Sequence, residues 1–392
     1  MINKIKYIAL ELYIILAVIF LDRSYLNICS LIYAGIVLLC FILNFKTAVG
    51  RKITKSNLRI LIFLALSILI ILISSKYSVF NTLMVFSFAI IAYVEFGSYE
   101  IKISELKYQN YFDILVSVGI FIYWIIGSVQ NITDFSVFIL PSTWDKNYTG
   151  ITIFLLLVYF YKRRFLFGLI SCIPYIFTLN SRLLQLSVCL MFIFTFGLNF
   201  LIKHGIIKEN SKLFSVKAIH IFFTLIITTV VMILLSVIWT TKVSNNIVGE
   251  YQSSWNDTSN AIRTRSNIYA TSLILTEKEL MFYGYDDDIK KVLGVEDENT
   301  ATLYSGYRLV QPHNLILNLL LKHGVIFTIF YVYLLSKMMA LYWNKDNIPF
   351  LITYLISNMI MHSLLSTTYL LFFFFVICSR SKKKFASKIT QG

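Results

Sequence analysis

The chain of 392 residues is 58% hydrophobic and only 14% charged, with a mean hydropathy of +0.74 and a formal net charge of +15. Soluble domains carry about 25% charged residues, so this composition excludes an ordinary soluble protein. Repeated apolar runs, each long enough to cross a hydrocarbon core about 30 Å thick, predict an all-α polytopic membrane protein instead.

Twelve apolar runs are expected to form transmembrane helices. The run 149–162 is short, and only a tight turn separates 164–180 from 182–202, so ten or eleven spans remain an alternative. In chain order the expected spans are 6–21, 26–43, 58–74, 79–96, 112–128, 149–162, 164–180, 182–202, 217–239, 324–342, 348–362 and 364–379.

One long polar segment interrupts this series. It contains ten of the twenty acidic residues, and it is too long to be a simple connector. The chain therefore divides into helices 1–9 in 1–239, a long extracytoplasmic loop with short helices in 240–312, helices 10–12 in 313–380 and a basic cytoplasmic tail in 381–392.

The distribution of basic residues predicts the orientation. If both termini are cytoplasmic, the inner segments hold 23 of the 35 lysines and arginines, whereas each short outer loop holds one. This asymmetry follows the positive-inside rule. The net positive charge is therefore attributed mainly to cytoplasmic anchoring at the membrane lipid, and nucleic acid is not expected as a partner.

The long loop has its own secondary-structure signal. Residues 261–276 are expected to form a helix with an apolar face made of Ile262, Ile268, Tyr269, Leu273 and Leu275. The nearby run Asp286, Asp287 and Asp288 is interpreted as a solvated surface. No metal site and no cofactor are expected.

A polar stripe opens the tenth expected span. Asn314, Asn318 and Lys322 are spaced four residues apart, so on a helix they share one face, and His313 precedes them. Amide and ammonium groups in so apolar a segment cost free energy unless they meet partners or water. These residues therefore need partners or water in the folded protein.

Three local patterns resemble the O-antigen polymerase and O-antigen ligase family of bacterial polysaccharide assembly, which includes Wzy-type polymerases. They are "LNSR" at 179–182, "RTRSNIYATSLILTEKELMFYGYD" at 263–286 and "HNLILNLLLKHGVI" at 313–326. The resemblance covers about residues 150–380. It departs from the family pattern after Gly284, where Tyr285 and Asp286 stand and the family often has a second glycine.

The resemblance implies a metal-independent glycosyltransferase in the bacterial cytoplasmic membrane. It would transfer a glycan from a polyprenyl-diphosphate donor to a sugar hydroxyl of another lipid-linked repeat at the outer face. A chain-length regulator and a flippase of the same pathway are the implied protein partners.

The resemblance also suggests roles for single residues. His313 would act as the catalytic base, since histidine titrates in the useful pH range. Arginine binds phosphate oxygens bidentately and stays charged beside an apolar wall. The expected substrate-binding residues are Arg182, Arg265, Tyr269, Arg308, Asn314, Asn318 and Lys322.

Alternatives remain open at this stage. His313 could be an ordinary interfacial histidine, Arg182 could snorkel from an outer turn, and Arg263 could contact diphosphate in place of Arg265. An O-antigen ligase would share the donor and differ in the acceptor. A lipid-linked oligosaccharide flippase would not be expected to carry a 73-residue outer element.

Overall fold

A computed structural model describes residues 109–130, 146–179, 181–208, 211–244, 258–276, 312–360 and 368–378, with single positions elsewhere. Every regular element in these ranges is helical. The helices are α6 (Gln109–Gln130), α7 (Lys146–Arg163), α8 (Leu166–Thr178), α9 (Arg182–Lys203), η2 (Lys212–Phe214), α10 (Ala218–Ser244), α11 (Thr258–Thr276), α15 (Leu315–Leu341), α16 (Ile348–Ile360) and α17 (Thr368–Cys378).

These helices match the expected elements closely, with one exception. Six of the expected spans coincide with helices within a few residues. The five spans from 112–128 to 217–239 correspond to α6 to α10, and 348–362 corresponds to α16. Helix α17 lies inside the expected span 364–379. The helix expected over 261–276 is present as α11. The first four expected spans, from 6–21 to 79–96, lie outside the described ranges, as does the tail 381–392.

The exception is the span expected over 324–342, because α15 begins nine residues earlier, at Leu315. The leucine-rich stretch after Asn314 is apolar enough to form helix. The capping oxygen of Asn314 allows the helix to start there. Gly324, the first residue of the expected span, is instead a break inside the helix.

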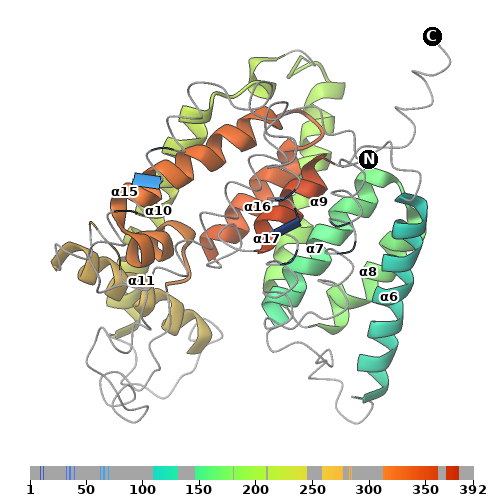
Figure 1. The fold of residues 1–392 in the computed structure, drawn as a ribbon, viewed down its shortest axis with the longest axis horizontal. Helices are drawn as coiled ribbons and strands as arrows, with labels where there is room; N and C mark the ends of the chain where they lie inside the picture. The colour runs from blue at the N-terminus through green and yellow to red at the C-terminus, as the bar shows by residue number, and fades with distance from the viewer. Residues whose placement is uncertain are drawn as a thin grey trace.

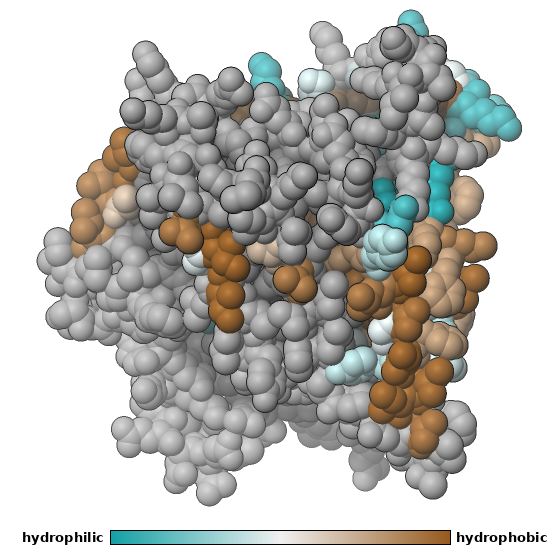
Figure 2. All heavy atoms as spheres, turned by 45° about the vertical axis from the view of Figure 1, so that its right-hand side comes forward, coloured by the Kyte–Doolittle hydropathy of each residue, from teal (hydrophilic) through white to brown (hydrophobic). Residues whose placement is uncertain are grey.

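The described helices carry the surface expected of a membrane protein. Four segments are long and apolar enough to cross a bilayer: Asn110–Val129, Arg182–Lys203, Ala218–Ile238 and Leu315–Leu341. Large apolar side chains on α10, such as Ile227 and Leu234, are exposed on the outside of the molecule. Such side chains form brown bands along the described helices in Figure 2. Lipid tails are the environment in which this exposure costs nothing.

Helix α7 lies at the centre of one group of helices, formed with α6, α8, α9, α16 and α17 (Figure 1). Its residues 151–160 are all buried. Helix α8 approaches α7 closely because Gly168 has no side chain, and a Cβ there would collide with the ring of Phe160. Helix α9 joins α16 through a buried hydrogen bond of 2.8 Å between the hydroxyls of Ser187 and Ser357.

The second group consists of α10, α11 and α15, which all contact one another (Figure 1). Helix α16 links the two groups, since it packs on α9 and also contacts α15 and α10. Two of the three segments that carry the family resemblance, 263–286 and 313–326, therefore belong to the same group of helices.

Candidate functional site

Helix α15 is divided into two segments at Gly324. The backbone angles of this residue are φ 73° and ψ 172°, a conformation that essentially only glycine adopts. The hydroxyl of Thr328 donates a hydrogen bond of 2.7 Å to the Gly324 carbonyl at the start of the second segment. The first segment, 315–323, is thus a short helix set at an angle to the longer one.

The first segment begins at a buried cap. The side-chain oxygen of Asn314 accepts hydrogen bonds from the backbone N–H groups of Ile316 (3.0 Å) and Leu317 (3.2 Å). The hydroxyl of Thr229 on α10 donates to the same oxygen at 3.5 Å. Asn314 therefore holds the start of α15 and ties it to α10. Its expected contact with substrate stays a prediction.

The loop residue Gly284 lies against the break in α15. Its φ is +75°, and a Cβ at this position would fall on the backbone of Lys322, His323 and Gly324. Only glycine permits two backbones to approach this closely. Gly284 of one motif therefore contacts the "KHG" part of another.

Helix α11 packs against the first segment of α15. Ala270 and Ile274 from α11 form a small buried cluster with Leu317 and Leu321 from α15. Of the apolar face expected on α11, Leu273 packs partly buried against this cluster and Leu275 is exposed, while the side chains of Ile262 and Tyr269 lie outside the described residues. The most buried of the described α11 side chains are Ser266, Asn267, Ala270 and Ile274.

Two buried carboxamides lie on α11 and α15. The side chain of Asn267 on α11 is 5% exposed and that of Asn318 on α15 is 4% exposed. Oδ1 of Asn267 and Nδ2 of Asn318 have no hydrogen-bond partner in the described part of the chain. An unmet buried polar group costs about 1–3 kcal/mol, so each of these atoms lowers the stability of the described packing.

The remaining residues of the polar stripe differ in their surroundings. His313 and Lys322 are both half-buried, at the two ends of the first segment of α15. His323 is fully buried, and its ring centroid lies 5.0 Å from that of Phe327. His313 is therefore more accessible than His323, as its expected role requires.

Of the three expected arginines, only Arg182 has a described side chain. Arg182 is exposed at the first position of α9, where Ser181 caps the helix by accepting from the Leu184 N–H at 3.3 Å. Helix α9 packs mainly on α7 and α16. Arg265 and Tyr269 belong to α11, but their side chains lie outside the described residues, as does Arg308.

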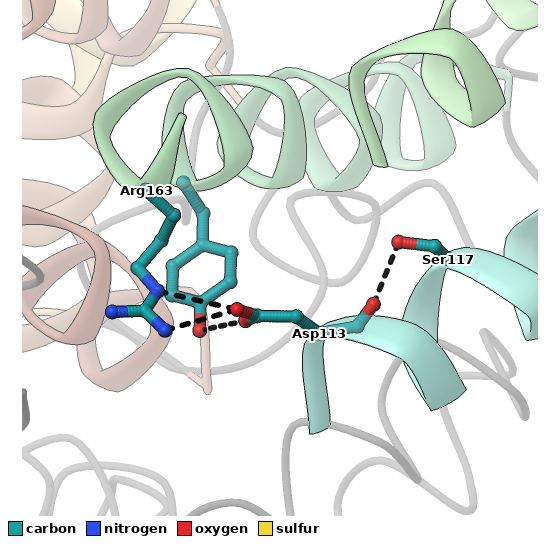
Figure 3. Close-up of polar contacts among 4 residues, drawn as sticks. Asp113, Ser117 and Arg163 are labelled. Carbon is teal, nitrogen blue, oxygen red and sulfur yellow. Dashed lines mark hydrogen bonds and ion pairs between the residues drawn. The ribbon is translucent and has the colours of Figure 1, made fainter. Parts of the chain in front are cut away.

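A buried ion pair, which the charge pattern did not predict, joins α6 to α7. Nη2 of Arg163 lies 3.0 Å from Oδ2 of Asp113, and the two side chains are 3% and 0% exposed (Figure 3). The hydroxyl of Tyr159 donates to Oδ1 of Asp113 at 2.6 Å. Ser117, one turn further along α6, donates to the Asp113 backbone carbonyl. Asp113 is the one charged residue in the sequence of α6, and that isolation was the available signal.

The side chain of the neighbouring Lys162 also forms hydrogen bonds between helices of the bundle. Its ammonium group donates to the carbonyls of Val376 and Ile377 at the end of α17 and to Oδ1 of Asn347, 2.9 Å away. A cation is favoured at these carbonyls by the helix dipole. Lys162 and Arg163 therefore both stabilise contacts between helices.

The described ranges contain no group of three or more His, Cys, Asp or Glu side chains that could hold a metal ion. No family model, curated protein or solved structure matches the chain, so its function has to be inferred from its own residues and their arrangement.

Proposed function

We propose that this protein is a polysaccharide repeat-unit polymerase of the bacterial cytoplasmic membrane. It transfers a glycan from a polyprenyl-diphosphate donor to a sugar hydroxyl of a second lipid-linked repeat at the outer face. The proposal includes the twelve-span topology with 240–312 outside and both termini in the cytoplasm. It also includes a chain-length regulator and a flippase as partners in the pathway.

The observation that carries the proposal is the contact between two motifs distant in sequence. The segment 263–286 and the segment 313–326 each resemble the polymerase and ligase family. They pack together through α11 and the first part of α15, and Gly284 touches the break at Gly324. A site built from both segments requires such a contact.

The chemistry needs a base for the acceptor and cations for the leaving group. A sugar hydroxyl is a very weak acid, and His313 is the half-buried histidine at the entrance to α15. The hydroxyl oxygen attacks the anomeric carbon, the bond to diphosphate breaks, and His313 takes the hydroxyl proton. Arg182, Arg265, Arg308 and Lys322 are proposed to balance the charge of the departing diphosphate, and Tyr269 to pack on a sugar.

The first test uses a strain that lacks the gene. Single lipid-linked repeats should accumulate at the outer face, since they can no longer be joined. Accumulation of finished lipid-linked chains would indicate a ligase instead. Repeats retained at the inner face would indicate a flippase.

The same strain, complemented with variants, tests the site. His313→Ala should lower turnover about 10²–10⁴-fold, as expected for loss of a general base, while binding of the lipid-linked donor is retained. His220→Ala, at an exposed position in the first turn of α10, is the matched control and should restore normal polymer. Normal chain length with His313→Ala would contradict the assignment of the base.

A further inference from the structure

The start of α15 is held from a neighbouring helix as well as from within. Oδ1 of Asn314 accepts hydrogen bonds from the first backbone N–H groups of α15, as a capping side chain does. It also accepts from the hydroxyl of Thr229 on α10, at 3.5 Å. The same hydroxyl lies 2.9 Å from the carbonyl of Leu225, so its single proton is shared between two acceptors. The contact with Asn314 is thus an anchor to α10 that α15 does not need in order to begin.

Both partners of this contact are enclosed by protein. The side chain of Asn314 is 0% exposed and that of Thr229 is 4% exposed. Thr229 also lies near the middle of the spanning segment Ala218–Ile238. Because water has little access to these groups, a hydrogen bond between them is stronger than it would be at the surface.

His313 is the residue directly before this anchored cap. The backbone enters α15 through Asn314, whose φ and ψ of −128° and 129° are extended. A contact that fixes Asn314 relative to α10 also fixes the Cα of His313, which is one planar peptide unit away. A general base must lie within about 2.6–3.2 Å of the atom whose proton it takes, so its placement decides its efficiency.

We propose that Thr229 is a positioning residue for His313 and acts through Asn314, which rests on the function proposed above. The hydroxyl of Thr229 holds the cap, and the cap holds the histidine at the acceptor hydroxyl. Asn314 then serves the reaction through its neighbour in the chain and does not touch the saccharide. Thr229 lies outside all three segments that resemble the polymerase and ligase family.

Thr229→Val tests this role, because valine shares the branched shape of threonine and lacks the hydroxyl. The variants are measured in the purified full chain reconstituted in lipid vesicles, with lipid-linked repeats isolated from the deletion strain. Thr229→Val should lower kcat about tenfold and leave KM unchanged. A misplacement of 1 Å can cost about 10²-fold, and the loss of one anchor among several displaces the base by less. Thr229→Ser keeps the hydroxyl and should restore most of kcat.

Thr353→Val on α16 is the matched control. Thr353 is also buried, and its hydroxyl donates to a carbonyl of its own helix, that of Pro349, at 2.8 Å. The control makes the same substitution at a buried helical threonine away from the cap, so its kcat should equal that of the wild type. Similar melting temperatures of the two valine variants would show that the loss of kcat does not come from instability.

Asn314→Ser separates positioning from contact with the substrate. Serine caps helices about as well as asparagine, so α15 should still begin at Leu315, but the shorter side chain gives up the contact with Thr229. We expect the same fall in kcat as with Thr229→Val, an unchanged KM, and no further loss when the two substitutions are combined. A raised KM, with effects that multiply in the double variant, would overturn the proposal, since Asn314 would then bind the saccharide itself.

The decisive measurement uses the residual turnover of His313→Ala. Because Thr229 acts through His313, adding Thr229→Val to this background should cause no further loss. A further tenfold loss there would overturn the proposal, as would wild-type kcat in Thr229→Val alone. If Thr229→Val does not fold, Thr229→Ala replaces it in the same comparisons.

These outcomes differ from failure of the proposed function. If His313→Ala is slow and Thr229→Val is as fast as the wild type, only the positioning role is wrong. If His313→Ala itself is as fast as the wild type, the base assignment is wrong and the positioning role falls with it. If wild-type protein in vesicles does not consume the repeats, the polymerase itself is wrong, and the positioning role is withdrawn as well.

Discussion

Asp113, the one charged residue of α6, is buried in the bundle together with its partner Arg163. Burying either charge alone is expensive, and the measured penalty for removing one partner of such a pair is about 3–5 kcal/mol. Here Asp113 also accepts from Tyr159, so its carboxylate has partners on both oxygens. The pair joins the first turns of α6 to the last turn of α7.

We therefore expect Asp113→Ala and Arg163→Met each to destabilise the protein by about 3–5 kcal/mol. The double variant should be less destabilised than the sum, because it leaves no unpaired charge. Thermal unfolding of the detergent-purified protein measures this effect. Arg164→Ala is the control, since Arg164 is adjacent in sequence but exposed. Single variants as stable as this control would mean that the ion pair is not important.

At the scale of the element, the break in α15 decides where the candidate site lies. The first segment is held by the Asn314 cap at one end and by Gly284 at the other. Broken helices occur at membrane depth where the freed backbone groups are buried in protein or line a cavity. The first segment contacts α10 through Asn314 and α11 through Leu317 and Leu321, while the second segment of α15 packs in the bundle.

Glycine variants test whether the contact at the break matters. Gly284→Ala should lower both thermal stability and polymer formation, because the new Cβ meets backbone atoms that cannot rotate away. Gly205→Ala is a matched control, since Gly205 has nearly the same φ, +71°, but open space around it. The control carries only the strain of a positive φ, about 1–2 kcal/mol.

The difference in melting temperature between Gly284→Ala and Gly205→Ala measures the effect of the contact with α15. A Gly284→Ala protein that melts at the same temperature as Gly205→Ala and makes normal polymer would show that the loop does not rest on α15.

At the scale of the whole molecule, the topology can be tested directly. In a background without the five native cysteines, an impermeant thiol reagent should label Ser253→Cys in intact cells, because residues 240–312 are expected outside. Ser381→Cys should react only after the cells are opened. The reverse pattern would show that the orientation inferred from the basic residues is inverted.

The sequence by itself determined the class of the protein and most of its described helices. Apolar runs specify helix positions because each run must satisfy its own backbone groups in lipid. The polar stripe at Asn314, Asn318 and Lys322 was also visible, since residues spaced four apart share a helix face. These are local properties, and one sequence contains them in full.

Only the tertiary structure decided which of these elements meet. The pairing of Asp113 with Arg163 joins residues 50 positions apart, and the contact of Gly284 with α15 joins residues 38 to 40 positions apart. Each depends on which helix faces which neighbour, and that is set by side-chain shape across the interface. Ala270 and Ile274 of α11 pack on Leu317 and Leu321 of α15, a pairing that neither segment reveals by itself.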